Sequence, residues 1–165
     1  MAKRFIVVVG ILVCAHLTAS GQPQQSPRVQ GADAKRLVGM WRLVSITQPD
    51  GSSEARGAHP VGIIVYHASG HMSAQVMTDS ALRRRWVGAQ PTPEEALAAL
   101  REYVAYFGTY SVDERARRIT HHQEGGLTPG ALPDVVREYE LLADDRVVLT
   151  QIDGNWNRLL WERIP

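Results

Sequence analysis

Arg137 and Tyr139 are the residues whose types and spacing point most directly to binding chemistry. They lie two positions apart in an alternating run, so in a strand they share one face with Leu141. Glutamates at the intervening positions favour water on the other face. We therefore expect Arg137 and Tyr139 to point into the core. A buried guanidinium needs a partner, which is either a protein carboxylate or the anionic head group of a ligand.

His121 and His122 are adjacent, so a strand would turn them to opposite faces and they cannot bind one metal ion together. The position of Ile119 favours His121 as the inward residue. An inward histidine serves either as a hydrogen-bonded core residue or as a ligand or acid–base contact, because its pKa lies near neutrality. Both interpretations stay open at this point.

His67 and His71 flank the turn residues 68–70. A three-residue loop would make them neighbours across a hairpin, whereas a four-residue turn would place Tyr66 opposite His71. No third ligand accompanies the pair, so the sequence predicts no metal site.

Aromatic residues gather after residue 102, where Tyr103 and Phe107 are predicted to share a helix face. They are either core residues or the lid of a pocket that stacks on a flat ligand. The candidate ligand contacts of the whole chain are Arg137, Tyr139, His121, Tyr110, Tyr106, Gln75 and His71.

The sequence contains no recognisable motif for catalysis, phosphate binding or metal binding. There is no nucleophile motif, phosphate-binding glycine loop, metal-spaced cluster or pair of carboxylates at a plausible cleft, so no cofactor is predicted. A net charge of +1 provides no basic surface for nucleic acid. An enzyme stays an alternative, since a barrel with His121, Arg137 and Tyr139 inside can still protonate or cyclise a bound molecule.

Short strand-like runs separated by turn residues must position these side chains. The predicted strands are 40–47, 61–67, 71–77, 108–112, 118–123, 135–142, 146–152 and 158–163. One helix interrupts them. Thr92, Pro93 and Glu95 form an N-terminal capping box, apolar residues follow at helical spacing as far as Phe107, and Gly108 ends the helix.

Eight antiparallel strands at spacings of about ten residues favour a closed barrel, which leaves no open sheet edge. Such a barrel holds packed side chains or one small ligand. The helix lies between the third and fourth strands, where we expect it to close one mouth.

The first residues form a separate unit. Lys3 and Arg4 precede an apolar run from Phe5 to Leu17, and small residues follow before Gln22. This pattern predicts a signal peptide at 1–21, a disordered leader at 22–33 and a barrel domain at 34–165. A periplasmic or secreted protein with no stable membrane insertion after cleavage is expected, since the apolar run is too short to span a bilayer.

Several blocks of sequence carry a family resemblance. They are Leu37–Ser45 with Gly39-Met40-Trp41, His59–Tyr66, Gly70–Gln75, Tyr103–Tyr110, His121-His122, Arg137-Glu138-Tyr139 and Leu160–Arg163. In this order they resemble the lipocalin-like domain family of bacterial and fungal proteins, from about Leu37 to Arg163. The resemblance implies an eight-stranded barrel of the calycin type. It also implies that Trp41 packs across the closed end with Arg163 over its face.

The sequence supports three functional hypotheses. The first is an exported protein that binds a small, largely apolar or amphipathic molecule inside the barrel. The second is a cofactor-independent isomerase, cyclase or hydratase acting on such a molecule. The third is a structural envelope domain with a filled barrel. A pocket of a few hundred Å³ facing Arg137 would separate the first two from the third.

Overall fold

The computed structural model describes residues 31–165 except 53–55, 84, 131 and 153–156. The predicted signal peptide and most of the predicted leader lie outside the described residues. The strands are β1 (Gly39–Thr47), β2 (Val61–Tyr66), β3 (His71–Met77), β4 (Tyr103–Asp113), β5 (Arg118–Gly126), β6 (Val135–Leu141), β7 (Arg146–Gln151) and β8 (Arg158–Ile164), and the helices are α1 (Ala32–Leu37) and α2 (Pro93–Arg101).

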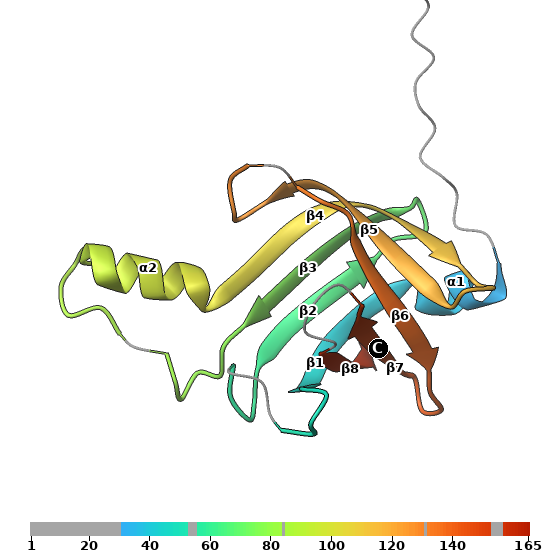
Figure 1. The fold of residues 1–165 in the computed structure, drawn as a ribbon, viewed down its shortest axis with the longest axis horizontal. Helices are drawn as coiled ribbons and strands as arrows, with labels where there is room; N and C mark the ends of the chain where they lie inside the picture. Colours follow the sequence, from blue (N-terminus) through green and yellow to red (C-terminus); the bar gives the residue numbers. More distant parts are fainter. Residues whose placement is uncertain (1–30, 53–55, 84, 131, 153–156) are drawn as a thin grey trace, which may run out of the picture.

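The eight strands form one closed antiparallel barrel in which each strand pairs with the next and β8 pairs with β1 (Figure 1). This confirms the barrel predicted from the sequence. Alternation along each strand places one set of side chains inside. In β2, for example, Ile64 and Tyr66 are 1% exposed, whereas Val61 and Ile63 face outward.

The start of β4 corrects the predicted helix. Helix α2 ends at Arg101, and β4 begins at Tyr103, so Val104 to Phe107 belong to a strand. This segment pairs with β3 from Met77 opposite Tyr103 to His71 opposite Thr109. Tertiary pairing with two neighbouring strands overrides the helical spacing of its apolar residues. The predicted helix face shared by Tyr103 and Phe107 is therefore wrong.

Helix α2 does not close a mouth of the barrel. It projects away from the strands, none of its residues is buried, and Leu97 and Leu100 are about half exposed (Figure 1). Its predicted capping box is confirmed, since the Thr92 side chain accepts from the Glu95 N–H and the Glu95 carboxylate accepts from the Thr92 N–H. No helix in the described part of the chain is long and apolar enough to cross a membrane.

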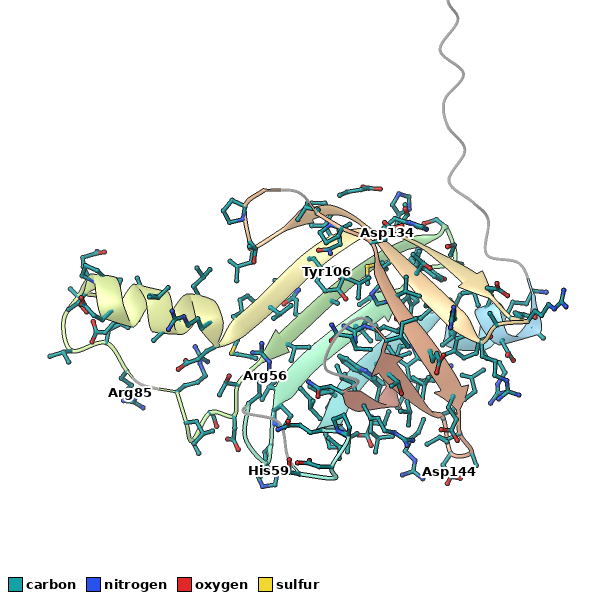
Figure 2. The ribbon with its side chains drawn as sticks, viewed as in Figure 1. Arg56, His59, Arg85, Tyr106, Asp134 and Asp144 are labelled. Carbon is teal, nitrogen blue, oxygen red and sulfur yellow. The ribbon has the colours of Figure 1, made fainter. Side chains whose placement is uncertain are left out.

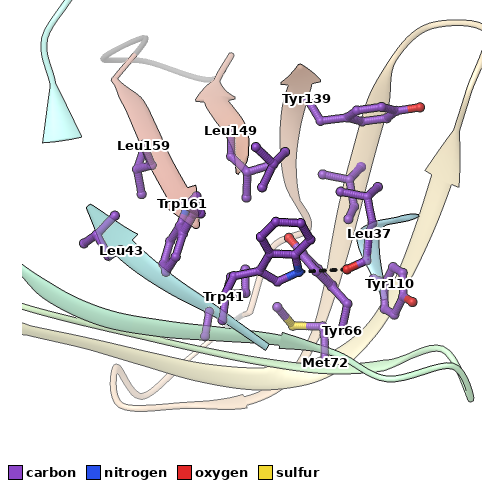
Figure 3. Packing of buried hydrophobic residues seen from close by; sticks show 14 of the residues in the cluster. Leu37, Trp41, Leu43, Tyr66, Met72, Tyr110, Tyr139, Leu149, Leu159 and Trp161 are labelled. Carbon is purple, nitrogen blue, oxygen red and sulfur yellow. Dashed lines mark hydrogen bonds between the residues drawn. The ribbon is translucent and has the colours of Figure 1, made fainter. Parts of the chain in front are cut away.

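The opposite end of the barrel is closed by α1, which the sequence analysis did not predict. Leu37 of α1 is fully buried, and its carbonyl accepts a 2.8 Å hydrogen bond from Trp41 Nε1 (Figure 3). The Arg163 guanidinium lies 4.2 Å from the centre of a Trp41 ring and donates to the Val38 carbonyl. The plug inferred from the family resemblance is therefore confirmed.

Long-range contacts hold α1 in place. The Glu114 carboxylate accepts hydrogen bonds from the N–H groups of Asp33 and Ala34, at 2.7 and 3.0 Å. The Tyr139 hydroxyl donates to Asp33 at 3.0 Å. These partners are about 80 or more positions away in the chain, so the local sequence does not predict this helix.

Candidate functional site

A cavity of about 350 Å³ opens at the mouth of the barrel, at the end away from α1. It is formed where β1, β5 and β7 end and where β4, β6 and β8 begin. Its lining residues are Ile46, Arg56, Val76, Val104, Tyr106, Gln123, Val135, Arg137, Gln151, Asn157 and Leu159. Figure 2 labels Tyr106 on β4 and Arg56 beside the strands at this end. Its lining is mixed, with five aliphatic and five polar side chains besides Tyr106, so it offers both apolar contacts and hydrogen-bonding groups to a small molecule.

Arg137 carries the most distinctive polar group of this cavity. It is half-buried on β6, and within the described part of the chain its Nη1 is buried without a hydrogen-bond partner. Asn157 Oδ1 is buried in the same way. A buried donor or acceptor that makes no hydrogen bond costs about 1–3 kcal/mol of stability, and a charged group costs more. Two lining residues of the cavity therefore carry a cationic donor and a neutral acceptor that lack a partner among the described residues.

A smaller void of about 30 Å³ lies next to this cavity, between side chains of the barrel interior. Val76, Val104, Tyr106, Arg137 and Leu159 line both spaces, so the two are adjacent. Trp161 lines the void, is 1% exposed, and its Nε1 has no hydrogen-bond partner among the described residues. The remaining lining residues are Ile64, Ala74 and Leu149.

His121 lies behind Tyr106 and is fully buried. Its Nδ1 lies 2.8 Å from the Tyr106 hydroxyl, and its Nε2 lies 2.7 Å from the Tyr66 hydroxyl. Burial, followed by the positive charge of Arg137, holds the pKa of His121 well below its usual value. The ring is therefore neutral at physiological pH and connects two tyrosines.

The structure brings three of the predicted ligand contacts together. Arg137 and Tyr106 line the cavity, and His121 supports Tyr106 from behind. Alternation along β6 points Arg137 and Tyr139 inward, as predicted. His121 is the inner histidine, while His122 lies outside between Ser111 and Asp134.

The other predicted contacts lie apart from the cavity. Tyr110 is buried toward the closed end and donates to the His67 carbonyl, and burial raises the pKa of its hydroxyl to about 12. Tyr139 is buried beside α1, where burial and then Asp33 raise the pKa of its hydroxyl. Gln75 is exposed on the outer face and accepts from Tyr103.

His71 is exposed on the hairpin between β2 and β3. The His67 N–H donates to the His71 carbonyl, so the three-residue loop is the alternative that the chain adopts. Both imidazoles lie 2.8 Å from the Ser69 hydroxyl through Nδ1. Within the described residues, no group of three or more His, Cys, Asp or Glu side chains is arranged to hold a metal ion.

Sequence reasoning missed Trp161 and Asn157 as site residues. The alternation of Leu159, Trp161 and Arg163 along β8 is a signal that places Trp161 inside. No pattern shows, however, that the indole N–H is left without a partner, because that depends on the packing of several strands.

One comparison with known proteins identifies the family. The model of a family described as the lipocalin-like domain matches residues 38–164, which span every strand of the barrel. No curated protein matches the chain. The match and the closed eight-stranded barrel agree with each other and with a calycin-type fold. The chain belongs to the lipocalin-like domain family.

Proposed function

We propose that the barrel binds a small amphipathic molecule, with an acidic or carbonyl end at Arg137 and an apolar body against the aliphatic wall of the cavity. The observation that carries the proposal is Arg137, which lines a cavity of about 350 Å³ and whose buried Nη1 has no hydrogen-bond partner among the described residues. A guanidinium suits carboxylate or phosphate oxygens, and a partner supplied by a ligand offsets its desolvation.

The cavity at the mouth supports binding over a purely structural role, because a space of this size accepts a small ligand, while the deeper interior holds packed side chains and a small void. Two residues on which the enzyme hypothesis depends, His121 and Tyr139, are engaged in other contacts. Both ring nitrogens of His121 bond to tyrosines, and the Tyr139 hydroxyl bonds to Asp33 near the closed end. Neither group lines the cavity.

An exported location, periplasmic or secreted, is part of the proposal and rests on the signal-like pattern of residues 1–21. Mass spectrometry of the protein recovered outside the cytoplasm tests it. An N-terminus at or near Gln22 supports export with cleavage, whereas an intact Met1 or a lipid on Cys14 contradicts it.

The binding proposal is tested by calorimetric titration of decanoate, an amphipathic acid, into the native protein and Arg137→Met. The variant is expected to bind about 30-fold or more weakly, because the carboxylate would be buried unpaired at a cost of about 2–5 kcal/mol. Its melting temperature should be unchanged or slightly raised, since Nη1 has no partner to lose among the residues that the structure describes.

Arg118→Met is the matched control. Arg118 is an exposed arginine on the outer face of β5, paired with Glu138. Its replacement removes the same charge without touching the cavity and should leave decanoate affinity unchanged. If Arg137→Met unfolds the protein, or binds decanoate as well as the native chain, Arg137 is a structural residue and the site assignment fails.

A further inference from the structure

The small void beside Trp161 has a composition that restricts what can occupy it. Three of its lining residues are polar, Tyr106, Arg137 and Trp161, and the others are aliphatic. Its volume of about 30 Å³ is close to the share of liquid volume that one water molecule takes. The void therefore accommodates about one oxygen atom, and the polar groups around it decide which kind.

Hydrogen-bond accounting fixes the role of the Tyr106 hydroxyl. Tyr66 is 1% exposed, and among the described residues the partner of its hydroxyl is His121 Nε2. The Tyr66 proton must then go to Nε2, because a buried O–H without an acceptor is costly. Nε2 of the neutral ring is thus the acceptor, and the ring proton lies on Nδ1.

Nδ1–H then donates to the Tyr106 oxygen at 2.8 Å. The phenolic proton of Tyr106 is consequently not used by His121 and is free to point into the void. The buried Tyr66–His121 pair acts as a support that turns Tyr106 into a hydrogen-bond donor toward the barrel interior.

The other two polar groups are donors by their chemistry. An indole N–H and a guanidinium donate and have no acceptor atom. Trp161 Nε1 and Arg137 Nη1 are both buried without partners in the described structure. A water molecule would find donors for its lone pairs but a shortage of acceptors for its two hydrogens. A carbonyl or carboxylate oxygen, which only accepts, matches this environment.

We propose that the void is a carbonyl-oxygen pocket, in which Trp161 Nε1, Tyr106 Oη and Arg137 Nη1 donate to one oxygen of the bound molecule. The inference rests on the proposed binding function and specifies its ligand class. The molecule carries a ketone, aldehyde or carboxyl group at its inner end, with an apolar body that fills the adjoining cavity. Preorganised donors around such an oxygen also polarise the carbonyl bond.

The test compares methyl octyl ketone with the matching secondary alcohol, which has the same chain but carries a proton that needs an acceptor. The native protein should bind the ketone more tightly. Infrared spectroscopy of the carbonyl-labelled ketone should show its stretch at lower frequency when bound than in an apolar solvent, because donors weaken the C=O bond.

Trp161→Phe removes the indole N–H and keeps an aromatic ring in the void. It should weaken ketone binding about 5- to 10-fold, the loss of one hydrogen bond, and move the stretch to higher frequency. Tyr106→Phe should act in the same direction. Trp41→Phe is the control, because Trp41 Nε1 bonds to Leu37 at the closed end. It should leave both readings unchanged.

The outcomes separate this inference from the proposed function. If decanoate binding depends on Arg137 but the ketone is not preferred, or Trp161→Phe changes neither affinity nor stretch, the carbonyl pocket is wrong and the binding function stands. If neither decanoate nor the ketone binds the native protein, both proposals fall.

Discussion

His121 should make the barrel sensitive to mild acid. The residue is fully buried between two tyrosine hydroxyls, and burial and Arg137 lower its pKa. An unfolded histidine takes up a proton near pH 6.5. Below that pH the unfolded chain binds a proton that the native barrel does not, so stability is complete above about pH 6.5 and is lost as the pH falls toward the lowered native pKa.

The size of the effect follows from linkage. One proton bound only by the unfolded chain changes the unfolding free energy by about 1.4 kcal/mol per pH unit. Between about pH 6.5 and pH 5, His121 should therefore remove about 2 kcal/mol, a large part of the stability of a domain of this size. Urea unfolding at a series of pH values measures this slope.

His121→Gln removes the titrating group, so its stability should decline less steeply over this range by about one proton. His122→Gln is the matched control, because His122 is half-exposed on the outer face between Ser111 and Asp134. It makes the same chemical replacement outside the barrel and leaves the contacts of His121 with Tyr66 and Tyr106 in place. Carboxylates that titrate on acidification are common to all three proteins and cancel in the comparison. Parallel curves for the native chain and His121→Gln would refute a buried neutral His121.

Two further substitutions test the packing of the barrel around the site. Arg163→Met should destabilise the barrel by about 1–3 kcal/mol in urea unfolding, because it removes the cation–π contact with Trp41 and the hydrogen bond to Val38. An unchanged midpoint would show that the closed end does not depend on Arg163. Gly108→Ala should lower the free energy of unfolding by at least about 2 kcal/mol or prevent folding. Its Cβ would lie 2.0 Å from the His122 carbonyl oxygen, at a register shift in β4. A variant with native stability would contradict this strand packing.

The strand pattern of this chain was readable from the sequence because most strands alternate, as β2 and β3 do, and end at turn residues. The inward direction of Arg137 and His121 followed from the same alternation. The helical spacing of 97–107 misled the prediction, since a segment with apolar residues at such intervals also serves as a strand once β3 and β5 pair with it. Pairing partners, rather than local period, decided that segment.

The details of the site were beyond sequence reasoning for a different reason. Helix α1 depends on Glu114 and Tyr139, which are remote in the chain. The donor state of Tyr106 depends on Tyr66 and His121, which come from two other strands. Whether a buried group such as Trp161 Nε1 finds a hydrogen-bond partner depends on the three-dimensional packing of several strands, so a sequence pattern does not predict it.

The most direct test of the central claim is a crystal structure of the protein with decanoate. Our account predicts the alkyl chain inside the barrel between β4 and β8, with a carboxylate oxygen about 2.7–3.2 Å from Arg137 Nη1. Decanoate seated in an ordered site outside the barrel, for example between α2 and the segment around Trp86, with the interior cavity closed, would contradict it.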